Sequence, residues 1–146
     1  MFKTIVVGTD GSDTAKVAVQ QAADLAKNHG SELHLVMSAS GVSETRLREE
    51  RQGAPDDVQH AINPNEDIEA QLKAVADSLG DDVNVKTHAK QGDPSEAIID
   101  VAAQNNADLI VVGNKGMTGA KRFFLGAVPN KVSHHAPCSV LIVRTT

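Results

Sequence analysis

The chain has 146 residues, of which 40% are hydrophobic, 23% charged and 2% aromatic, and its formal net charge is −5. This balance predicts one soluble domain with a single aliphatic core. The few aromatic residues argue against a module that stacks single-stranded nucleic acid, one cysteine excludes an intrachain disulfide, and no apolar run is long enough to span a membrane.

The first predicted elements are a buried strand at residues 5–7 and a helix after it. The strand is a short β-branched run. Ser12 is a candidate N-cap for the helix, small apolar residues then recur at helical spacing, and Gly30 ends it. The segment Gly8–Gly11 therefore predicts a loop between a strand and a helix.

A second buried strand is predicted at residues 33–36, followed by a long polar stretch. Residues 39–64 fit no regular element. In a parallel sheet, a long insertion at the carboxyl end of a strand lies where ligands bind. The segment is an insertion that either closes over a ligand as a lid or is a disordered loop, and the sequence favours neither.

The middle of the chain predicts two helices and an edge strand between them. Asn65 is the expected cap of the first helix, which ends at Gly80, and residues 83–87 alternate as a half-exposed edge strand does. Asp93 opens a capping box with Glu96 and has proline at the first helical position.

The last third predicts a buried strand at residues 109–112, a glycine-rich loop, a short helix from near Ala127 to Pro137, and a buried strand at Val140–Val143. Strands that alternate with helices indicate a parallel sheet. The prediction is a single α/β domain over residues 1–146, with a doubly wound, Rossmann-like sheet of five parallel strands and helices on both faces.

The glycine-rich loop is the first candidate site. Gly113, Gly116 and Gly126 follow a predicted strand and precede a predicted helix, so backbone amides and a helix N-terminus can approach a phosphate. Residues 109–146 contain no acid, which favours a local anion site over a loop that only makes turns. The basic residues of this segment are Lys115, Lys121, Arg122, Lys131 and Arg144.

Asp10 is the second candidate, in the loop directly after the first strand. Its carboxylate can accept hydrogen bonds from ribose hydroxyls or hold a divalent metal such as Mg²⁺, and it can equally form the turn that caps the first helix. Neither a dinucleotide-binding fingerprint nor a Walker P-loop is present. His134 and His135 suit the end of a helix, and no zinc spacing or catalytic triad is evident.

These residues resemble the universal stress protein family over essentially the whole chain. The resemblance rests on Ile5–Ser12, Gly92–Pro94, Ala107–Gly113 and Ala136–Val143. The nucleotide-binding subgroup carries G-x2-G-x9-G followed by Ser or Thr. The three glycines of the loop match this spacing, and Ala127 departs from it.

The resemblance implies a five-stranded parallel sheet, a homodimer formed through Val140–Val143, and ATP, AMP or cyclic AMP as ligand, with or without Mg²⁺. It implies that Asp10 binds ribose and that the adenine lies against Gly8, Thr9, Val36, Met37 and Ser38. The phosphate is expected at Gly113, Asn114, Lys115, Gly116, Gly126, Ala127 and Val128.

The leading hypothesis is a cytoplasmic nucleotide-binding protein that acts in stress response or signalling as a regulatory or reservoir protein, without a nucleic-acid or membrane partner. The alternatives are a slow ATPase or self-phosphorylating enzyme, and a dimeric interaction protein with a vestigial pocket. Phosphoryl transfer requires carboxylates for Mg²⁺ and a group that positions the nucleophile. Asp10 is the only obvious acid near the predicted site, so an enzyme is disfavoured.

Overall fold

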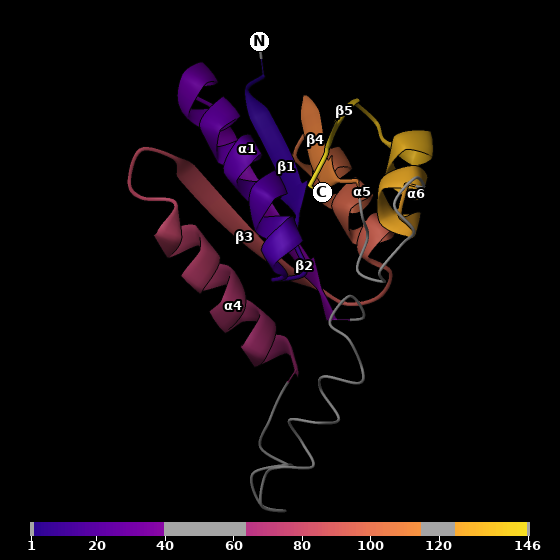
Figure 1. Cartoon of the computed structure of the whole chain (residues 1–146), viewed down its shortest axis with the longest axis horizontal. Coiled ribbons are helices and arrows are strands. Elements are labelled where there is room, and N and C mark those ends of the chain that lie inside the picture. Colours follow the sequence, from indigo (N-terminus) through magenta and orange to yellow (C-terminus); the bar gives the residue numbers. More distant parts are fainter. Residues whose placement is uncertain (1, 40–63, 115–124, 146) are drawn as a thin grey trace, which may run out of the picture.

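A computed structural model of the chain describes residues 2–39, 64–114 and 125–145, with side chains of α4 from Asp67 onward (Figure 1). The predicted insertion at about 39–64 therefore lies almost entirely outside the described residues. In chain order the elements are β1 (Thr4–Gly8), α1 (Asp13–His29), β2 (Glu32–Ser38), α4 (Pro64–Ser78), β3 (Asn84–Lys90), α5 (Pro94–Gln104), β4 (Leu109–Gly113), α6 (Ala127–His135) and β5 (Ser139–Val143).

The five strands form one parallel sheet in the order β3-β2-β1-β4-β5. The predicted doubly wound fold is confirmed. The chain builds outward from β1 to β3 and then returns to add β4 and β5 on the other side of β1. This reversal places the topological switch point between β1 and β4, where sheets of this kind bind ligands.

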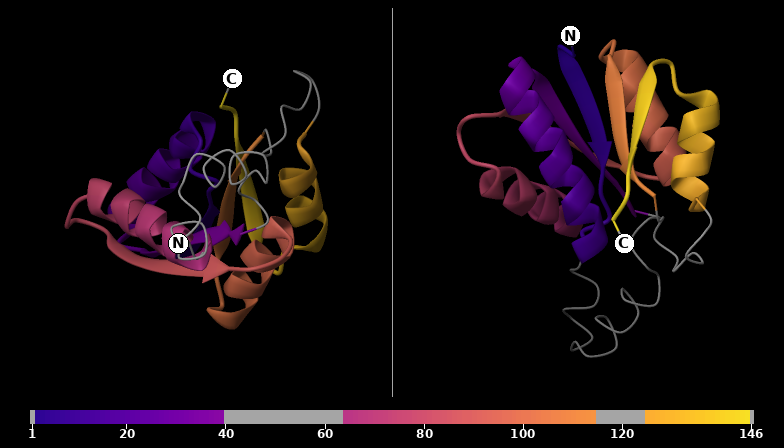
Figure 2. Two further views of the ribbon diagram at one scale, coloured as in Figure 1. Left: turned by 90° about the horizontal axis from the view of Figure 1, so that it is seen from below. Right: turned by 45° about the horizontal axis from the view of Figure 1, so that its top comes forward.

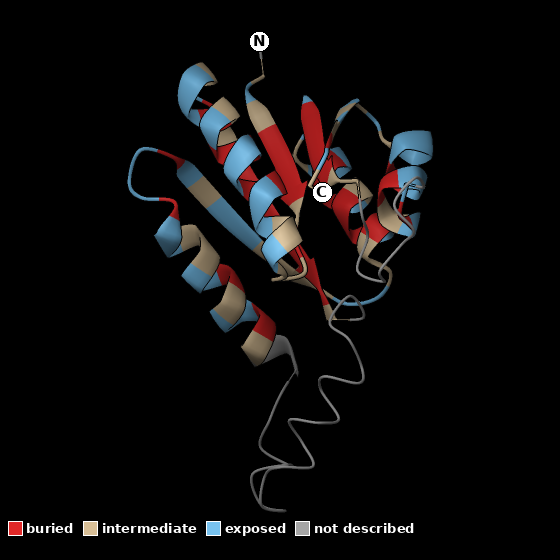
Figure 3. Ribbon diagram, in the orientation of Figure 1, coloured by how far each residue is buried: buried red, intermediate tan, exposed pale blue. Residues whose placement is uncertain are grey.

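Alternation along the strands divides the core into two layers. Ile5 and Val7 of β1 pack on the face covered by α1 and α4, whereas Val6 packs on the face covered by α5 and α6. The two views of Figure 2 show the helices on both sides of the sheet. Figure 3 shows the buried residues concentrated on the central strands and on the inner faces of the helices. The predicted aliphatic core is confirmed.

The two edge strands differ from one another, and one prediction about them is wrong. The residues of β3 are mostly exposed or half-buried, as expected of an edge strand. Val140–Val143 of β5 was expected to be fully buried, but only Val143 is, and Leu141 is 38% exposed. The reason is that β5 pairs with a strand on one side only. The apolar run therefore marks an uncovered edge rather than an interior strand.

The predicted ends of α1 are confirmed. The Ser12 hydroxyl accepts a hydrogen bond from the Ala15 N–H at 3.2 Å, and Gly30 ends the helix in the left-handed region with φ of 65°. α4 instead begins at Pro64, so Asn65 lies within the helix rather than at its cap. Proline fits a first helical position because it has no N–H to leave unpaired.

Asp93 is the N-cap residue of α5, but the predicted capping box with Glu96 is absent. The Asp93 carboxylate accepts from the Ser95 hydroxyl and from the Lys131 ammonium at 2.7 Å, and Lys131 also lies 3.4 Å from the Glu96 carboxylate. The Lys131 ammonium of α6 thus contacts both acids of the predicted box. The same contacts tie the first turn of α5 to α6.

Candidate functional site

A cleft opens at the carboxyl end of the sheet, at the switch point between β1 and β4. The space between its walls is partly open to solvent. The described residues that line it are Gly8, Thr9, Asp10, Ser12, Thr14, Ala15, Val36, Ser38, Pro94, Ile98, Val112, Gly113, Val128 and Pro129.

The end of β1 approaches α5 so closely that a side chain at position 8 would require the Ile98 side chain to move. A Cβ atom on Gly8 would lie 2.4 Å from Cδ1 of Ile98. The next residue, Thr9, is buried, and its N–H donates to the Val36 carbonyl at 2.9 Å. The hydrogen bond holds the loop after β1 against the end of β2. The side chains of Ile98 and Val36 form an apolar wall of the cleft.

The loop between β1 and α1 is organised by its own side chains. The Asp10 carboxylate accepts from the Ser12 N–H at 2.9 Å, and the Thr9 hydroxyl accepts from the Gly11 N–H at 3.2 Å. Gly11 has φ of 80°, a conformation that favours glycine. The turn-forming role considered for Asp10 is therefore observed. Asp10 is also the only ionisable side chain among the described residues that line the cleft.

Three helices, α1, α5 and α6, begin beside this cleft and contribute residues of their first turns to it. Figure 1 shows these helices starting at the same edge of the sheet, at the tips of the strand arrows. Gly126 is the N-cap of α6, and its carbonyl accepts the first hydrogen bond of that helix, from Asn130 at 3.1 Å. Converging helix N-termini carry partial positive charge and unpaired N–H groups, so the cleft suits an anion.

The end of β2 contributes alternate residues only. Val36 and Ser38 line the cleft, and the Ser38 hydroxyl also donates to the Gly92 carbonyl. Met37 is buried on the opposite face of the sheet, in the layer beneath α1 and α4. Successive strand residues point to opposite faces, so a three-residue range named from the sequence includes one residue that does not reach the cleft.

The structure brings together a large part of the predicted site. The predicted residues that line the cleft are Gly8, Thr9, Asp10, Val36, Ser38, Gly113 and Val128. Gly126 and Ala127 are adjacent, at the start of α6. The Asn114 carboxamide oxygen accepts from the Thr145 N–H at 2.8 Å and from the Thr145 hydroxyl at 3.0 Å. Lys115, Gly116, Lys121 and Arg122 lie outside the described residues.

Several lining residues were not predicted as site residues. Ile98 and Pro94 come from α5, and Pro129 comes from α6. Their sequence signal is ordinary: Pro94 marks a helix start and Ile98 belongs to a helical apolar stripe. Ser12 was recognised as a cap, and only the fold places it and Thr14 beside the cleft.

An ion pair between Asp93 and Lys131 links α5 to α6. The hydrogen bond from the Lys131 ammonium lowers the pKa of the Asp93 carboxyl, with further help from the Ser95 hydroxyl. Asp93 therefore stays charged through neutral pH. Within the described residues, no group of three or more His, Cys, Asp or Glu is arranged to hold a metal ion, and no helix is long and apolar enough to cross a membrane.

Comparison with known proteins gives consistent matches across the whole chain. Residues 1–144 match the Universal stress protein family. The chain is 35% identical over 147 residues to a universal stress protein of Thermus aquaticus, covering 99% of this chain and 100% of the relative. It is equally identical over 147 residues to universal stress protein Rv1636 of Mycobacterium tuberculosis, covering 99% and 98%.

Two solved structures show the same fold. A universal stress protein in complex with cAMP is 28% identical, has a TM-score of 0.72, and is matched over 99% of this chain and 98% of that chain. The hypothetical protein MJ0577 has a TM-score of 0.76 at 24% identity, over 99% and 96% of the two chains. The second likeness shows the fold alone.

Proposed function

Since the chain belongs to the universal stress protein family, we propose that its cleft binds an adenine nucleotide and that the protein acts in stress response as a regulatory or reservoir protein. The observation that carries the proposal is the cleft at the switch point, where an apolar wall faces the starts of three helices. The structural relative with cAMP bound supports the choice of an adenine nucleotide.

The proposed pose follows the polarity of the cleft. The adenine ring lies against Val36 and Ile98, because the described lining offers aliphatic rather than aromatic side chains. The ribose hydroxyls donate to the Asp10 carboxylate. The phosphate lies at the N-terminus of α6, near Gly126, Ala127 and Val128, where backbone N–H groups are available. Lys115 and Gly116 remain predicted contacts outside the described residues.

Asp10 is also the described residue that fits an Mg²⁺ ion. A single carboxylate together with nucleotide phosphate oxygens and water is an ordinary environment for Mg²⁺. We propose that any Mg²⁺ arrives with a nucleotide of two or more phosphates, where it would neutralise their charge. Isothermal titration with ATP in the presence of Mg²⁺ and in the presence of EDTA tests this, and equal affinities would contradict it.

The function as a binding protein, rather than a slow ATPase or self-phosphorylating enzyme, is part of the proposal. Among the described residues of the cleft, Asp10 has no second carboxylate beside it to hold metal or position water. We expect a cytosolic protein that retains ATP unchanged. Release of ADP or phosphate above a no-protein blank, or a mass increase of the protein by one phosphoryl group, would favour the enzyme.

The decisive experiment identifies the ligand directly. The protein is purified from cells without added nucleotide and denatured, and the released small molecules are analysed by mass spectrometry. Calorimetry then measures ATP, AMP and cyclic AMP on the nucleotide-free protein at one salt concentration. We expect an adenine nucleotide in the first experiment and saturable binding in the second. If none of the three nucleotides binds, the proposal fails and the alternative of a dimeric interaction protein with a vestigial pocket is favoured.

We also propose that the protein is a homodimer through β5. Among the described residues this edge strand pairs with a strand on one side only and presents Leu141, 38% exposed, and an uncovered apolar edge promotes aggregation. A second copy that pairs symmetrically with the strand would cover it. Light scattering at micromolar concentration should give twice the chain mass of 15.4 kDa, and Leu141→Lys should give the monomer. A wild-type monomer would contradict the proposal.

A further inference from the structure

Asn114 lies where three segments of the chain meet: the end of β4, the start of α6, and the residues that follow β5. Its backbone N–H donates to the Val143 carbonyl at 2.8 Å, and its backbone carbonyl accepts from the Gly126 N–H at 2.9 Å. Its carboxamide oxygen accepts two bonds from Thr145, from the N–H at 2.8 Å and from the hydroxyl at 3.0 Å.

We propose that Asn114 is a positioning residue that couples the edge strand β5 to the phosphate-binding end of the cleft, and that it does not itself contact the nucleotide. Its neighbour Gly113 lines the cleft, whereas the Asn114 side chain is occupied by Thr145. The inference rests on the proposed function, because it assigns a role within the same site.

The coupling between β5 and α6 follows from the hydrogen bonds that Asn114 makes to both segments. The Asn114 carbonyl holds Gly126, the N-cap residue of α6, so the position of Asn114 sets where that helix begins. The carboxamide ties the same residue to the segment after β5. An amide oxygen has two lone pairs and can accept both Thr145 donors at once. A displacement of β5, for example on pairing with another copy, is therefore transmitted to the start of α6.

The test uses two single variants and their combination. Asn114→Ala removes the acceptor, and Thr145→Val removes the hydroxyl from a residue outside the cleft. Each should weaken AMP binding about three- to tenfold, as expected for loss of a partly buried hydrogen bond. The double variant should bind AMP about as well as the single variant with the lower affinity, because both substitutions break the same link. Thr87→Val on β3, at the opposite edge of the sheet, is the matched control and should bind AMP normally.

A second readout does not depend on nucleotide. Hydrogen exchange of the Gly126 amide should accelerate in Asn114→Ala and in Thr145→Val. Asn114→Asp keeps an acceptor for both Thr145 donors and should leave that amide protected. If the wild type binds no nucleotide, the proposed function fails, and the exchange rates alone decide whether the coupling exists.

Any of three results would overturn the inference. One is a loss of AMP affinity in Asn114→Ala with none in Thr145→Val, since that pattern indicates direct contact between Asn114 and the nucleotide. Another is unchanged Gly126 exchange in both single variants. Additive losses in the double variant would likewise show that the two residues act independently.

Discussion

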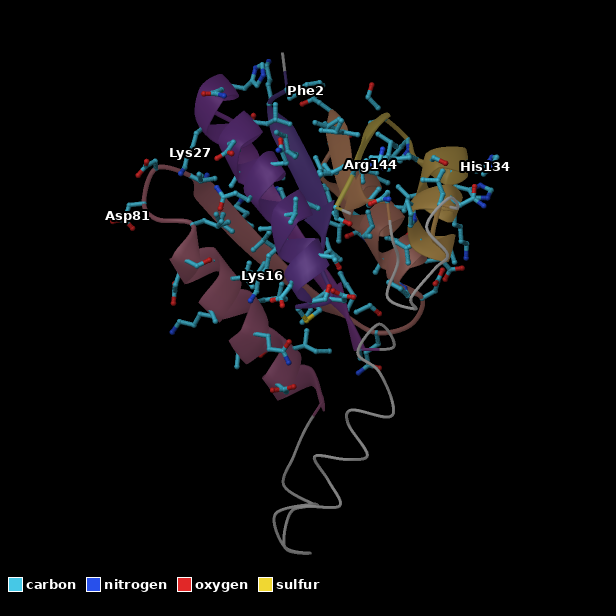
Figure 4. All side chains as sticks on the ribbon, in the orientation of Figure 1. Phe2, Lys16, Lys27, Asp81, His134 and Arg144 are labelled. Carbon is cyan, nitrogen blue, oxygen red and sulfur yellow. The ribbon has the colours of Figure 1, made fainter. Side chains whose placement is uncertain are left out.

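The two ends of the sheet use polar groups in different ways. At the amino end, the Asp108 carboxylate accepts from the backbone N–H groups of Lys3 and Thr4 at 2.8 and 3.0 Å, and the buried Ser31 hydroxyl donates to the Phe2 carbonyl. At the carboxyl end, three helices begin around an open cleft. Figure 4 labels Phe2, at the amino end, and Arg144, which follows β5.

The difference explains why the proposed ligand site lies at one end of the sheet, although helices cover both of its faces. In a parallel sheet the strand amino ends receive the ends of helices, and here short side chains seal them. The carboxyl ends receive the starts of helices, whose N–H groups have no partner within the helix. Changes at the amino end should therefore alter stability alone, whereas changes at the carboxyl end should alter binding.

The largest expected effect is at the start of α6. Ala127 is exposed and lacks the hydroxyl that the nucleotide-binding subgroup carries at this position. Ala127→Ser should add a hydrogen bond to a charged phosphate, which is worth about 1.5–3 kcal/mol, or roughly ten- to a hundredfold in ATP affinity. AMP and cyclic AMP should gain less, because ATP has more charge and more oxygens to satisfy.

Calorimetry on the wild type and Ala127→Ser with the three nucleotides measures this difference. The wild type should favour a ligand with one phosphate over ATP. The prediction is wrong if the wild type already binds ATP more tightly than the other two and serine changes nothing.

Gly8→Ala should be the next largest change. The added methyl group would overlap Ile98 Cδ1, at 2.4 Å. Overpacking of this kind costs about 1–3 kcal/mol of unfolding free energy. It should also weaken nucleotide binding, since both residues line the cleft.

The structure offers a matched rescue for this variant. Ile98→Val removes the Cδ1 atom, so the double variant Gly8→Ala with Ile98→Val should be more stable in urea than Gly8→Ala alone. If the second substitution lowers stability further, the close approach to Ile98 is not what excludes a side chain at position 8.

At the amino end, Ser31→Ala should lower the unfolding free energy by about 1 kcal/mol, because it removes a buried hydroxyl and leaves the Phe2 carbonyl without that hydrogen bond. Nucleotide affinity should be unchanged. Urea denaturation and calorimetry measure the two quantities. Ser133→Ala on α6 is the control, since that hydroxyl is exposed. A change in nucleotide affinity in Ser31→Ala would contradict the proposal that the amino end of the sheet affects stability alone.

The smallest effect is a pH dependence from a chain of side chains across β2 and β3. His34 is fully buried, its Nδ1 lies 2.7 Å from His88 Nε2, and its Nε2 lies 2.7 Å from the Glu32 carboxylate. Burial lowers the pKa of His88, and the charges of His34, Lys90 and Lys86 lower it further. The hydrogen bond from His34 lowers the pKa of Glu32.

Both shifts act in the same direction on stability. When a pKa is lower in the folded state, the unfolded chain takes up the proton first as the pH falls, so stability decreases. For His88 the decrease begins near the ordinary histidine value of 6.5, and for Glu32 it begins near 4.5. The urea midpoint should therefore fall between pH 7 and pH 5, and His88→Gln should reduce that fall.

His134→Gln is the control for this experiment, because His134 is exposed on α6 (Figure 4). It should leave the pH dependence of the wild type unchanged. An identical decline in the wild type and in His88→Gln would show that His88 does not contribute.

Local sequence signals predicted the elements because each signal acts within a few residues. The β-branched runs, the Ser12 cap and Gly30 determine strands and helix ends by local sterics and hydrogen bonding. Two features of the structure depend on residues far away in the chain. The Asp93 carboxylate at the start of α5 binds Lys131 of α6, and β5 is exposed because the fold leaves it at an edge.

The amino-acid sequence by itself determined the order of the elements, the parallel sheet and the segments that carry Asp10 and Gly113. Only the tertiary structure decided which side chains share the cleft. Ile98 is an ordinary core residue by its spacing, and it enters the site because α5 crosses over Gly8. The carboxamide oxygen of Asn114, a residue expected near the phosphate, accepts from the backbone N–H of Thr145, which lies after the last strand. Contacts between residues far apart in the chain depend on packing, which no short stretch of sequence encodes.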